Sequence, residues 1–470
     1  MGVTDRNPMD RIYGSVLLVV YCAIAFFMVR IHEPWMDELH SWVMARDLSF
    51  GELLAAMREE GHFCLWYLLL APFARSGCDV LCLRIISVSL TAIAAYLFIF
   101  KTKFSLLAKA AVLLSFPMIY SFPAVSRCYA LIPPLLFGIA LTYKDLPGNR
   151  YYFAILVGLL ANTHVYMEGM VLALFLVYLY EVLLPKYRRG ELRMEDFGPP
   201  VFIVAFVSLA FLQVMRNPFS DVFVTIGNTR IVRDNVCGLE PTVGVFFKYH
   251  SIIPAGIVPA GLKAIIVYTL AFIPMSILAW KMFLDFDKAG RFIVLVAVGW
   301  QFLFSLFIYS FGLHRVHLPF FIILTVFMMG GRPGKKENTM VVLLCIIVSI
   351  SGYCHNIYND IKRPYSNWEP LAKAIEDNVP EGEVVYSTIF FGENVSVYLS
   401  DPGRTIVSMP MDSIKSESFF AICWDSSSFN ADEAEAEIVY ESRDCISENY
   451  SLLRISKKEA ITDTNACSSL

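Results

Sequence analysis

Charged side chains are scarce in this chain of 470 residues, because Asp, Glu, Lys and Arg together make up only 17% of it, against roughly 25% in soluble domains. Hydrophobic residues account for 57%, and the mean hydropathy is +0.57. Apolar runs close to the roughly 18 residues that a membrane helix needs recur along most of the chain. This composition excludes an ordinary soluble globular protein and predicts a polytopic membrane protein.

Patterned cysteines are also missing. The sequence has 11 cysteines but no CxxC pair, so neither a zinc site nor a redox motif is predicted. Several lie inside apolar runs (Cys22, Cys82 and Cys345), where cysteine behaves as a small hydrophobe. The stretch from Met1 to Ile31 lacks a short apolar core followed by a small-residue cleavage site, which indicates a retained first helix and not a signal peptide.

Apolar runs of sufficient length predict about 11 transmembrane helices. They cover residues 12–31, 80–100, 106–122, 128–143, 151–163, 165–184, 197–215, 261–284, 291–310, 316–330 and 339–355. The segment 62–74 is apolar but short, and counting it as a twelfth helix would move the tail to the other side of the membrane. We interpret it as a helix that lies beside the membrane or is partly inserted.

The connections between the spans alternate in charge. Short basic or mixed connections at 101–103, 144–150, 185–193, 285–291 and 331–336 alternate with connections that carry few lysines. The positive-inside rule places the basic set in the cytoplasm. The loops at 32–79 and 216–260, the second of which contains Arg230 and Arg233, are then expected on the exterior face together with the tail.

The tail differs from the rest of the chain. From Ile361 onward it holds 19 acidic and 9 basic residues. Ser366 and Glu369 fit a capping box ahead of an amphipathic helix, and the strand-like runs EVVYSTIFF, VSVYL, RTIVSM, FFAICW and YSLLRIS follow it. We therefore predict two domains: a transmembrane domain over 1–358 and a small exterior α/β domain over 359–470.

The first exterior loop opens with HEPWMDELHSWVMARD, in which two carboxylates, Asp37 and Glu38, stand beside the end of a membrane span. Pro34 indicates a helix entry, and Asp37, His40 and Ser41 would then share one helix face. Trp35 and Trp42 would lie at headgroup depth. Asp37 has the chemistry of a general base for a hydroxyl. The alternative is an acidic first turn favoured by the helix dipole, and the residues alone leave both interpretations open.

The continuation of this loop resembles a known family. The string EPWMDE…ARDLS…MREEGH…LWYLLL, followed further on by SRCYALIPPLL (126–136), GLHR (312–315) and IKRPYSNWEPLAKAI (361–375), is similar to the glycosyltransferase C superfamily. The likeness is to bacterial protein-O-mannosyltransferase-like and lipid A aminoarabinose-transferase-like enzymes. One departure concerns Phe63 and Cys64, which stand where two prolines are expected and change the acceptor-side wall.

The resemblance implies an all-α polytopic fold of the glycosyltransferase C type with an exterior C-terminal domain. It further implies transfer of a sugar from a polyprenyl-phosphate-linked donor to a lipid, polysaccharide or protein acceptor on the exterior face of the cell membrane, with inversion. Asp37 would be the general base, and Glu38 would orient the acceptor or hold Asp37 through Arg46. A divalent metal is compatible with these carboxylates, although no ligand spacing requires one. Nucleic acid is not expected as a partner.

A leaving phosphate needs cations nearby. The candidates are Arg127, Arg315, Lys248 and His317, which stand near exterior span ends; snorkelling at the interface is the alternative role for each of them. His40, Arg46, Glu60, His62, Tyr129 and Glu168 are candidates for the acceptor side or for support of the carboxylates.

Two other functions stay open. A transporter or flippase for a lipid-linked glycan would require ionisable residues in mid-span, but Lys263 and Glu181 lie near predicted span ends. A polysaccharide ligase or polymerase would move a preassembled glycan instead of one sugar. That class concentrates its basic residues in a late exterior loop, so replacement of Asp37 discriminates between the two enzymes.

Overall fold

The computed structural model describes residues 8–60, 62–214, 239–254, 257, 262–308, 311–331, 333–389, 392–401, 403–409, 413–424, 434–442, 444–446 and 448–457. The chain forms two compact units. The helical unit comprises Met1–His32 and Met44–Asn359, and the C-terminal unit comprises Glu33–Val43 and Asp360–Leu470. The opening segment of the first loop therefore belongs with the tail and not with the helices that flank it in sequence.

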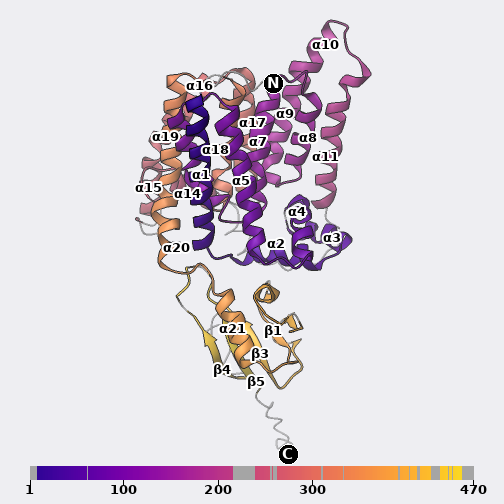
Figure 1. Cartoon of the computed structure of the whole chain (residues 1–470), viewed down its shortest axis with the longest axis vertical. Helices are drawn as coiled ribbons and strands as arrows, with labels where there is room; N and C mark the ends of the chain where they lie inside the picture. Colours follow the sequence, from indigo (N-terminus) through magenta and orange to yellow (C-terminus); the bar gives the residue numbers. More distant parts are fainter. Residues whose placement is uncertain are drawn as a thin grey trace, which may run out of the picture. The chain divides into compact units, whose positions relative to one another are not determined.

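The helical unit is a bundle of apolar helices (Figure 1). Its helices are α1 (Pro8–Ile31), α3 (Phe50–Glu60), α4 (Leu65–Arg75), α5 (Leu81–Lys101), α6 (Leu106–Leu113), α7 (Ile132–Tyr143), α8 (Arg150–Ala161), α9 (Glu168–Tyr178), α10 (Leu184–Arg188), α11 (Gly198–Val214), α14 (Leu239–Tyr249), α15 (Leu262–Ala271), α16 (Ile273–Asp285), α17 (Lys288–Phe307), α18 (Leu318–Met329) and α19 (Lys335–Ser351). Two helices, α2 (Met36–Asp47) and α20 (Tyr358–Lys362), cross the boundary between the units.

Seven helices within the described residues are long and apolar enough to cross a membrane. They are Pro8–Ile31, Leu81–Lys101, Val165–Arg188, Met194–Gln213, Ile266–Asp285, Lys288–Phe307 and Lys335–Lys362. Four shorter apolar helices accompany them: Leu65–Arg75, Cys128–Tyr143, Arg150–Ala161 and Arg315–Met329. The predicted fold class is confirmed: the chain is a helical polytopic membrane protein with a small C-terminal sheet domain.

Two apolar segments do not cross the membrane as single continuous helices. At 11 residues, α4 is about 16 Å long, which is well short of the roughly 30 Å hydrocarbon layer. The expected span 106–122 is divided, because α6 ends at Leu113 and a π-helical turn over Pro117–Ser121 follows it. Every residue of that turn is buried, so this part of the chain lies inside the bundle.

Close helix packing depends on glycine, as Gly169 and Gly158 illustrate. A Cβ on Gly169 of α9 would lie 2.2 Å from Cβ of Trp300 on α17, and a Cβ on Gly158 of α8 would lie 2.8 Å from the ring of Phe206 on α11. Both distances are shorter than any van der Waals contact between carbons. These positions therefore let neighbouring helices approach with their backbones, as small residues do in membrane bundles.

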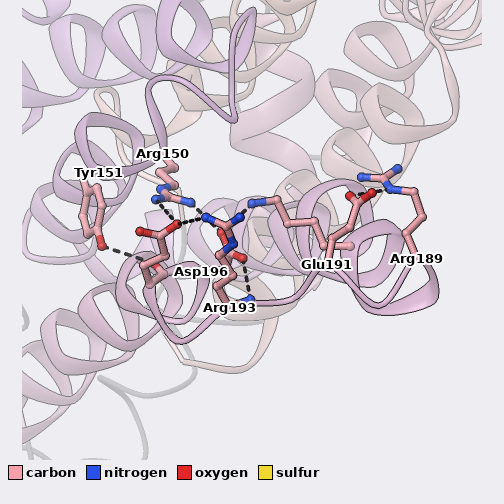
Figure 2. A network of polar contacts seen from close by, with 8 residues as sticks. Arg150, Tyr151, Arg189, Glu191, Arg193 and Asp196 are labelled. Carbon is pink, nitrogen blue, oxygen red and sulfur yellow. Dashed lines mark hydrogen bonds and ion pairs between the residues drawn. The ribbon is translucent and has the colours of Figure 1, made fainter.

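A buried carboxylate joins three helices at one end of the bundle (Figure 2). Asp196, whose side chain has no exposed surface, binds Nη1 of Arg150 at 2.6 Å and Nζ of Lys186 at 2.6 Å. It also accepts the backbone N–H of Arg193 at 3.0 Å. Since Arg150 begins α8, Lys186 lies in α10 and Asp196 precedes α11, this network fixes the connection between those helices.

The C-terminal unit contains a five-stranded mixed sheet with the order β2-β1-β3-β5-β4. Its strands are β1 (Val385–Ser387), β2 (Ile406–Ser408), β3 (Ser418–Cys423), β4 (Ala434–Glu441) and β5 (Ser451–Lys457). The first three are parallel to one another, whereas β5 pairs antiparallel with β3 and β4. Helix α21 (Trp368–Asn378) buries one face, including Leu371 and Ile375, in this unit.

Three details of the tail differ from the sequence prediction. The run VSVYL lies largely in the 3-10 helix Gly392–Val397 and is not a strand, while β4 was not predicted. The capping box is also wrong: Asn367 stands at the N-cap position of α21 and makes no side-chain cap hydrogen bond, and Ser366 Oγ donates instead to the carbonyl of Pro34 at 2.9 Å. For Ser366, a long-range contact with the first loop thus replaces the local cap.

Candidate functional site

Helix α2 begins where the sequence predicts, and its first turn contains both candidate carboxylates. Oε2 of Glu38 accepts the backbone N–H of Trp35 at 3.1 Å, and the carbonyl of Trp35 accepts the N–H of Glu38 at 3.0 Å. A third-position glutamate that reaches back to the cap is half of a capping box. Glu38 is only 1% exposed, so its carboxylate holds the helix entry.

Asp37 is less covered than its neighbour, with intermediate exposure. Its carbonyl accepts the hydroxyl of Ser41 at 2.9 Å, which confirms that these two residues share a helix face. His40 is half-buried on the same helix. Trp42 is 2% exposed, so its side chain is covered by protein. The geometry separates the two carboxylates into a structural Glu38 and a more accessible Asp37.

The backbone of Met36, the residue before Asp37, is bound by side chains from the tail. Met36 donates its backbone N–H to Oε1 and Oε2 of Glu448 at 3.1 and 3.0 Å. Its carbonyl accepts Nδ2 of Asn394 at 2.8 Å. The indole of Trp368 donates to Oε2 of Glu448 at 3.0 Å, and Glu448 is 3% exposed. Burial, together with the nearby Asp37 carboxylate, raises the pKa of Glu448 to about 7.

A polar cluster lies inside the helical unit and contains several of the predicted residues. Nη2 of Arg127 lies 2.9 Å from Nε2 of His62, and the ring of His62 meets that of His164 edge-on at 4.9 Å. The two histidines also form an isolated antiparallel bridge. Tyr129 Oη lies 3.1 Å from Nε2 of His164. We call His62, Arg127, Tyr129 and His164 the arginine–histidine cluster.

The hydrogen bonds of the cluster define its protonation. An arginine only donates, so Nε2 of His62 is the acceptor of its bond from Arg127. Nδ1 of His164 accepts the backbone N–H of Tyr166 at 3.1 Å. The proton of a neutral His164 therefore lies on Nε2 and is donated to Tyr129. The cluster thus places one permanent cation among neutral rings in a buried site.

Two further residues extend the cluster. The ring of His314 lies 5.6 Å from that of Tyr129, and the guanidinium of Arg315 lies 6.0 Å from the ring of Tyr166. His314 is 8% exposed, and it enters from the turn that precedes α18. Arg127 and Arg315, predicted from separate loops, are therefore brought to the same part of the bundle.

Lys248 and His317 both lie near Tyr249, whose ring is 6.2 Å from that of His317. Nζ of Lys248 lies 5.7 Å from the ring of Tyr249, and the ring of His317 lies 5.8 Å from that of His250. Within the described residues, neither ring nitrogen of His317 has a hydrogen-bond partner, although the side chain is fully buried. Partial burial lowers the pKa of Lys248. His250 stands beside Lys248 in the same exterior loop of the sequence, whereas His164 of the arginine–histidine cluster was missed, because nothing in its local pattern distinguishes it.

The other predicted residues are placed as follows. Arg46 makes a bidentate ion pair with Asp47, at 2.7 and 2.8 Å. Glu168 begins α9, and its Oε1 is buried with no hydrogen-bond partner among the described residues. The side chain of Glu60 lies outside the described residues, as do Arg230 and Arg233. No group of three or more His, Cys, Asp or Glu in the described parts of the chain could hold a metal ion.

Comparison with known proteins gives a structural likeness but no match in sequence. No family model matches the sequence, and no curated protein matches it. Among solved structures, the chain is similar to ArnT from Cupriavidus metallidurans bound to undecaprenyl phosphate. The match covers 94% of this chain and 97% of that one, at 13% sequence identity and a TM-score of 0.46. A likeness of this size assigns neither an activity nor a substrate to this chain.

Proposed function

We propose that the chain is a membrane glycosyltransferase that moves a sugar from a polyprenyl-phosphate-linked donor to an acceptor hydroxyl on the exterior face. The observation that supports this most directly is the arginine–histidine cluster, in which a 7% exposed Arg127 is held beside His62. A buried guanidinium is well suited to a phosphate, because its donors match two phosphate oxygens. A lipid-linked phosphate reaches such a site from the membrane.

The donor class follows from the proposed compartment. No nucleotide-sugar pool exists outside the cell, so an exterior transferase takes its sugar from a membrane lipid. In the reaction, the acceptor oxygen attacks the anomeric carbon as the bond from that carbon to the phosphate oxygen breaks. The polyprenyl phosphate leaves with the bonding electrons, and the configuration inverts. Arg127 and Arg315 would stabilise the leaving phosphate, with Lys248 and His317 as further cationic or hydrogen-bonding contacts.

Asp37 would take the proton of the acceptor hydroxyl. Its intermediate exposure is compatible with contact to a substrate, whereas Glu38 is engaged with the backbone of Trp35. We therefore assign the base to Asp37 and a supporting role to Glu38. His40, His62, Tyr129 and Glu168 remain candidates for the sugar or acceptor contacts.

The test is transfer of label from radiolabelled polyprenyl-phosphate sugars in membranes that contain the protein. We expect Asp37→Asn to lower kcat by roughly 10²- to 10⁴-fold, as removal of a general base does. Asp47→Asn, at the other end of α2, is the matched control and should keep the parental rate. If no labelled sugar leaves any donor while intact labelled lipid crosses the membrane, the flippase alternative is correct. Movement of a preassembled glycan that survives Asp37→Asn would instead indicate a ligase or polymerase.

A further inference from the structure

Within the C-terminal unit, residues of the tail bind both backbone groups of Met36, the first residue of α2. The N–H of Met36 is bound by Glu448 and its carbonyl by Asn394. Glu448 and Asn394 are 3% and 0% exposed. The C-terminal unit thereby determines where the backbone of the next residue, Asp37, begins.

We call the hydrogen bonds from Glu448 and Asn394 to the backbone of Met36 the anchor. Glu448 is itself held in place at both its carboxylate and its backbone. One oxygen, Oε2, accepts both the Met36 N–H and the indole N–H of Trp368 at 3.0 Å. The backbone of Glu448 is also fixed, since its N–H donates to the carbonyl of Tyr365 at 3.3 Å and it forms a parallel bridge with Ser366. Trp368 is itself 1% exposed, so the carboxylate cannot shift without disturbing the base of α21.

The same segment is held at two further points. Ser366 donates to the carbonyl of Pro34 at 2.9 Å, and the ring of Trp35 meets that of Tyr365 edge-on at 6.2 Å. All these contacts involve residues 34–36, directly before Asp37. A 1 Å displacement of a reacting group is enough to cost about 100-fold in rate, so a catalytic carboxylate at the end of this segment would depend on the anchor.

We propose that Glu448 is a positioning residue that, together with Asn394, holds the first turn of α2 and so sets the position of the Asp37 carboxylate. The catalytic part of this inference rests on the proposed role of Asp37. The anchoring part concerns the fold of the C-terminal unit and stands apart from it. On this proposal, the C-terminal unit takes part in the transfer reaction by positioning Asp37.

The titratable groups around Glu448 define how pH acts on the anchor. Asp37 faces it from α2, Tyr450 from the residue before β5, and Cys445 from the loop before it. All three are acidic or neutral, so none offsets a negative charge on Glu448. Burial and the Asp37 charge outweigh the hydrogen bonds from Met36 and Trp368, which favour the carboxylate, so the pKa of Glu448 is raised to about 7. The folded unit therefore favours the protonated carboxyl, and this contribution to its stability is lost as pH rises through 7.

Glutamine is the diagnostic substitution. Its side-chain oxygen can accept both N–H groups as the carbonyl oxygen of a protonated carboxyl does, but it does not titrate. We therefore expect Glu448→Gln to keep the anchor and to remove its pH dependence. Glu448→Ala removes the acceptor, and Asn394→Ala removes the second contact without touching Glu448. Glu437→Ala, on the exposed face of β4, is the matched control.

Hydrogen exchange of the full-length protein in nanodiscs measures the anchor directly, through the backbone amides of the segment 33–43. We expect Glu448→Ala to exchange there at least tenfold faster and Asn394→Ala several-fold faster, while Glu448→Gln and Glu437→Ala match the parent at pH 6. After correction for the intrinsic pH dependence of exchange, the parent should lose protection between pH 6 and 8 and Glu448→Gln should not. Unchanged exchange in Glu448→Ala and in Asn394→Ala would overturn the anchor.

Transfer from the labelled donor measures the consequence. If Glu448 positions Asp37, Glu448→Ala lowers kcat about tenfold or more and leaves KM for the donor within twofold, and Glu448→Gln restores kcat. Faster exchange with parental kcat overturns the positioning role, because the anchor would then be purely structural. A parental protein that transfers none of the donors rejects the proposed function, and with it the positioning role, while the exchange result still decides the anchor.

Discussion

Replacement of Asp196 by asparagine tests how much one buried carboxylate contributes to the bundle. The change keeps the size of the side chain and one acceptor oxygen but removes the charge that Arg150 and Lys186 share. Each hydrogen bond to a charged group contributes about 1.5–3 kcal/mol, and asparagine retains part of one. The side chains of Arg150 and Lys186 are 19% and 26% exposed, so water compensates part of the loss. We expect a net destabilisation of about 1–3 kcal/mol.

Thermal unfolding of the detergent-solubilised protein measures this effect. The buried free cysteines Cys128 and Cys345 become available to a thiol-reactive fluorophore only when the bundle opens, and the exposed Cys354 gives the baseline. Asp196→Asn should lower the midpoint by roughly 2–6 °C. The control is Glu191→Gln, whose ion pair with Arg189 has both side chains more than half exposed; such pairs contribute less than about 1 kcal/mol. Equal midpoint shifts in the two variants would refute the assignment of the network as structural.

Three further predictions concern packing, the C-terminal unit and pH. Gly169→Ala should destabilise the bundle by about 1–3 kcal/mol, measured by the same thiol assay, because its Cβ would overlap Trp300; Gly299→Ala, which meets nothing within 4 Å, should leave the midpoint unchanged. Trp368→Ala should cost about 3–5 kcal/mol and show as lost hydrogen-exchange protection of β5; intact protection would contradict its place in the core. Between pH 5 and 8, the C-terminal unit should lose about 2–3 kcal/mol of stability through Glu448, since the pKa of this residue is raised from 4.5 to about 7. Chemical denaturation at a series of pH values measures this loss, and a free energy of unfolding that falls as much with pH in Glu448→Gln would contradict it.

The sequence predicts features that depend on local chemistry. Apolar runs locate the helices, because each run must satisfy its own backbone in lipid, and Pro34 predicts the start of α2 within two residues. The carboxylates of the first turn were also evident, although only the structure separates Glu38 from Asp37. Edge strand β4 was missed because the first half of AEAEIVYE consists of Ala and Glu, which have weak strand propensity. Its charges suit an edge that must not pair with another chain.

Long-range partners could not be predicted. His62 and His164 are about a hundred residues apart, and nothing near either indicates the other. Ser366 satisfies the spacing of a capping box, yet its hydroxyl binds a carbonyl 332 residues away. The same holds for Asn394 and Met36, separated by 358 residues. Tertiary contacts of this kind depend on the whole fold, and no local pattern in the sequence indicates them.

The contact between Met36 and Glu448 also has a consequence for synthesis. The two residues are 412 positions apart, and at the usual about 5–20 residues per second the ribosome needs roughly 20–80 s to reach the second after the first. During that interval the start of α2 has no partner for its first backbone N–H from the tail. A nascent chain can therefore insert its helices long before Met36 is bound by the tail, so a stalled or shortened chain would occupy the membrane without the contact that holds the start of α2.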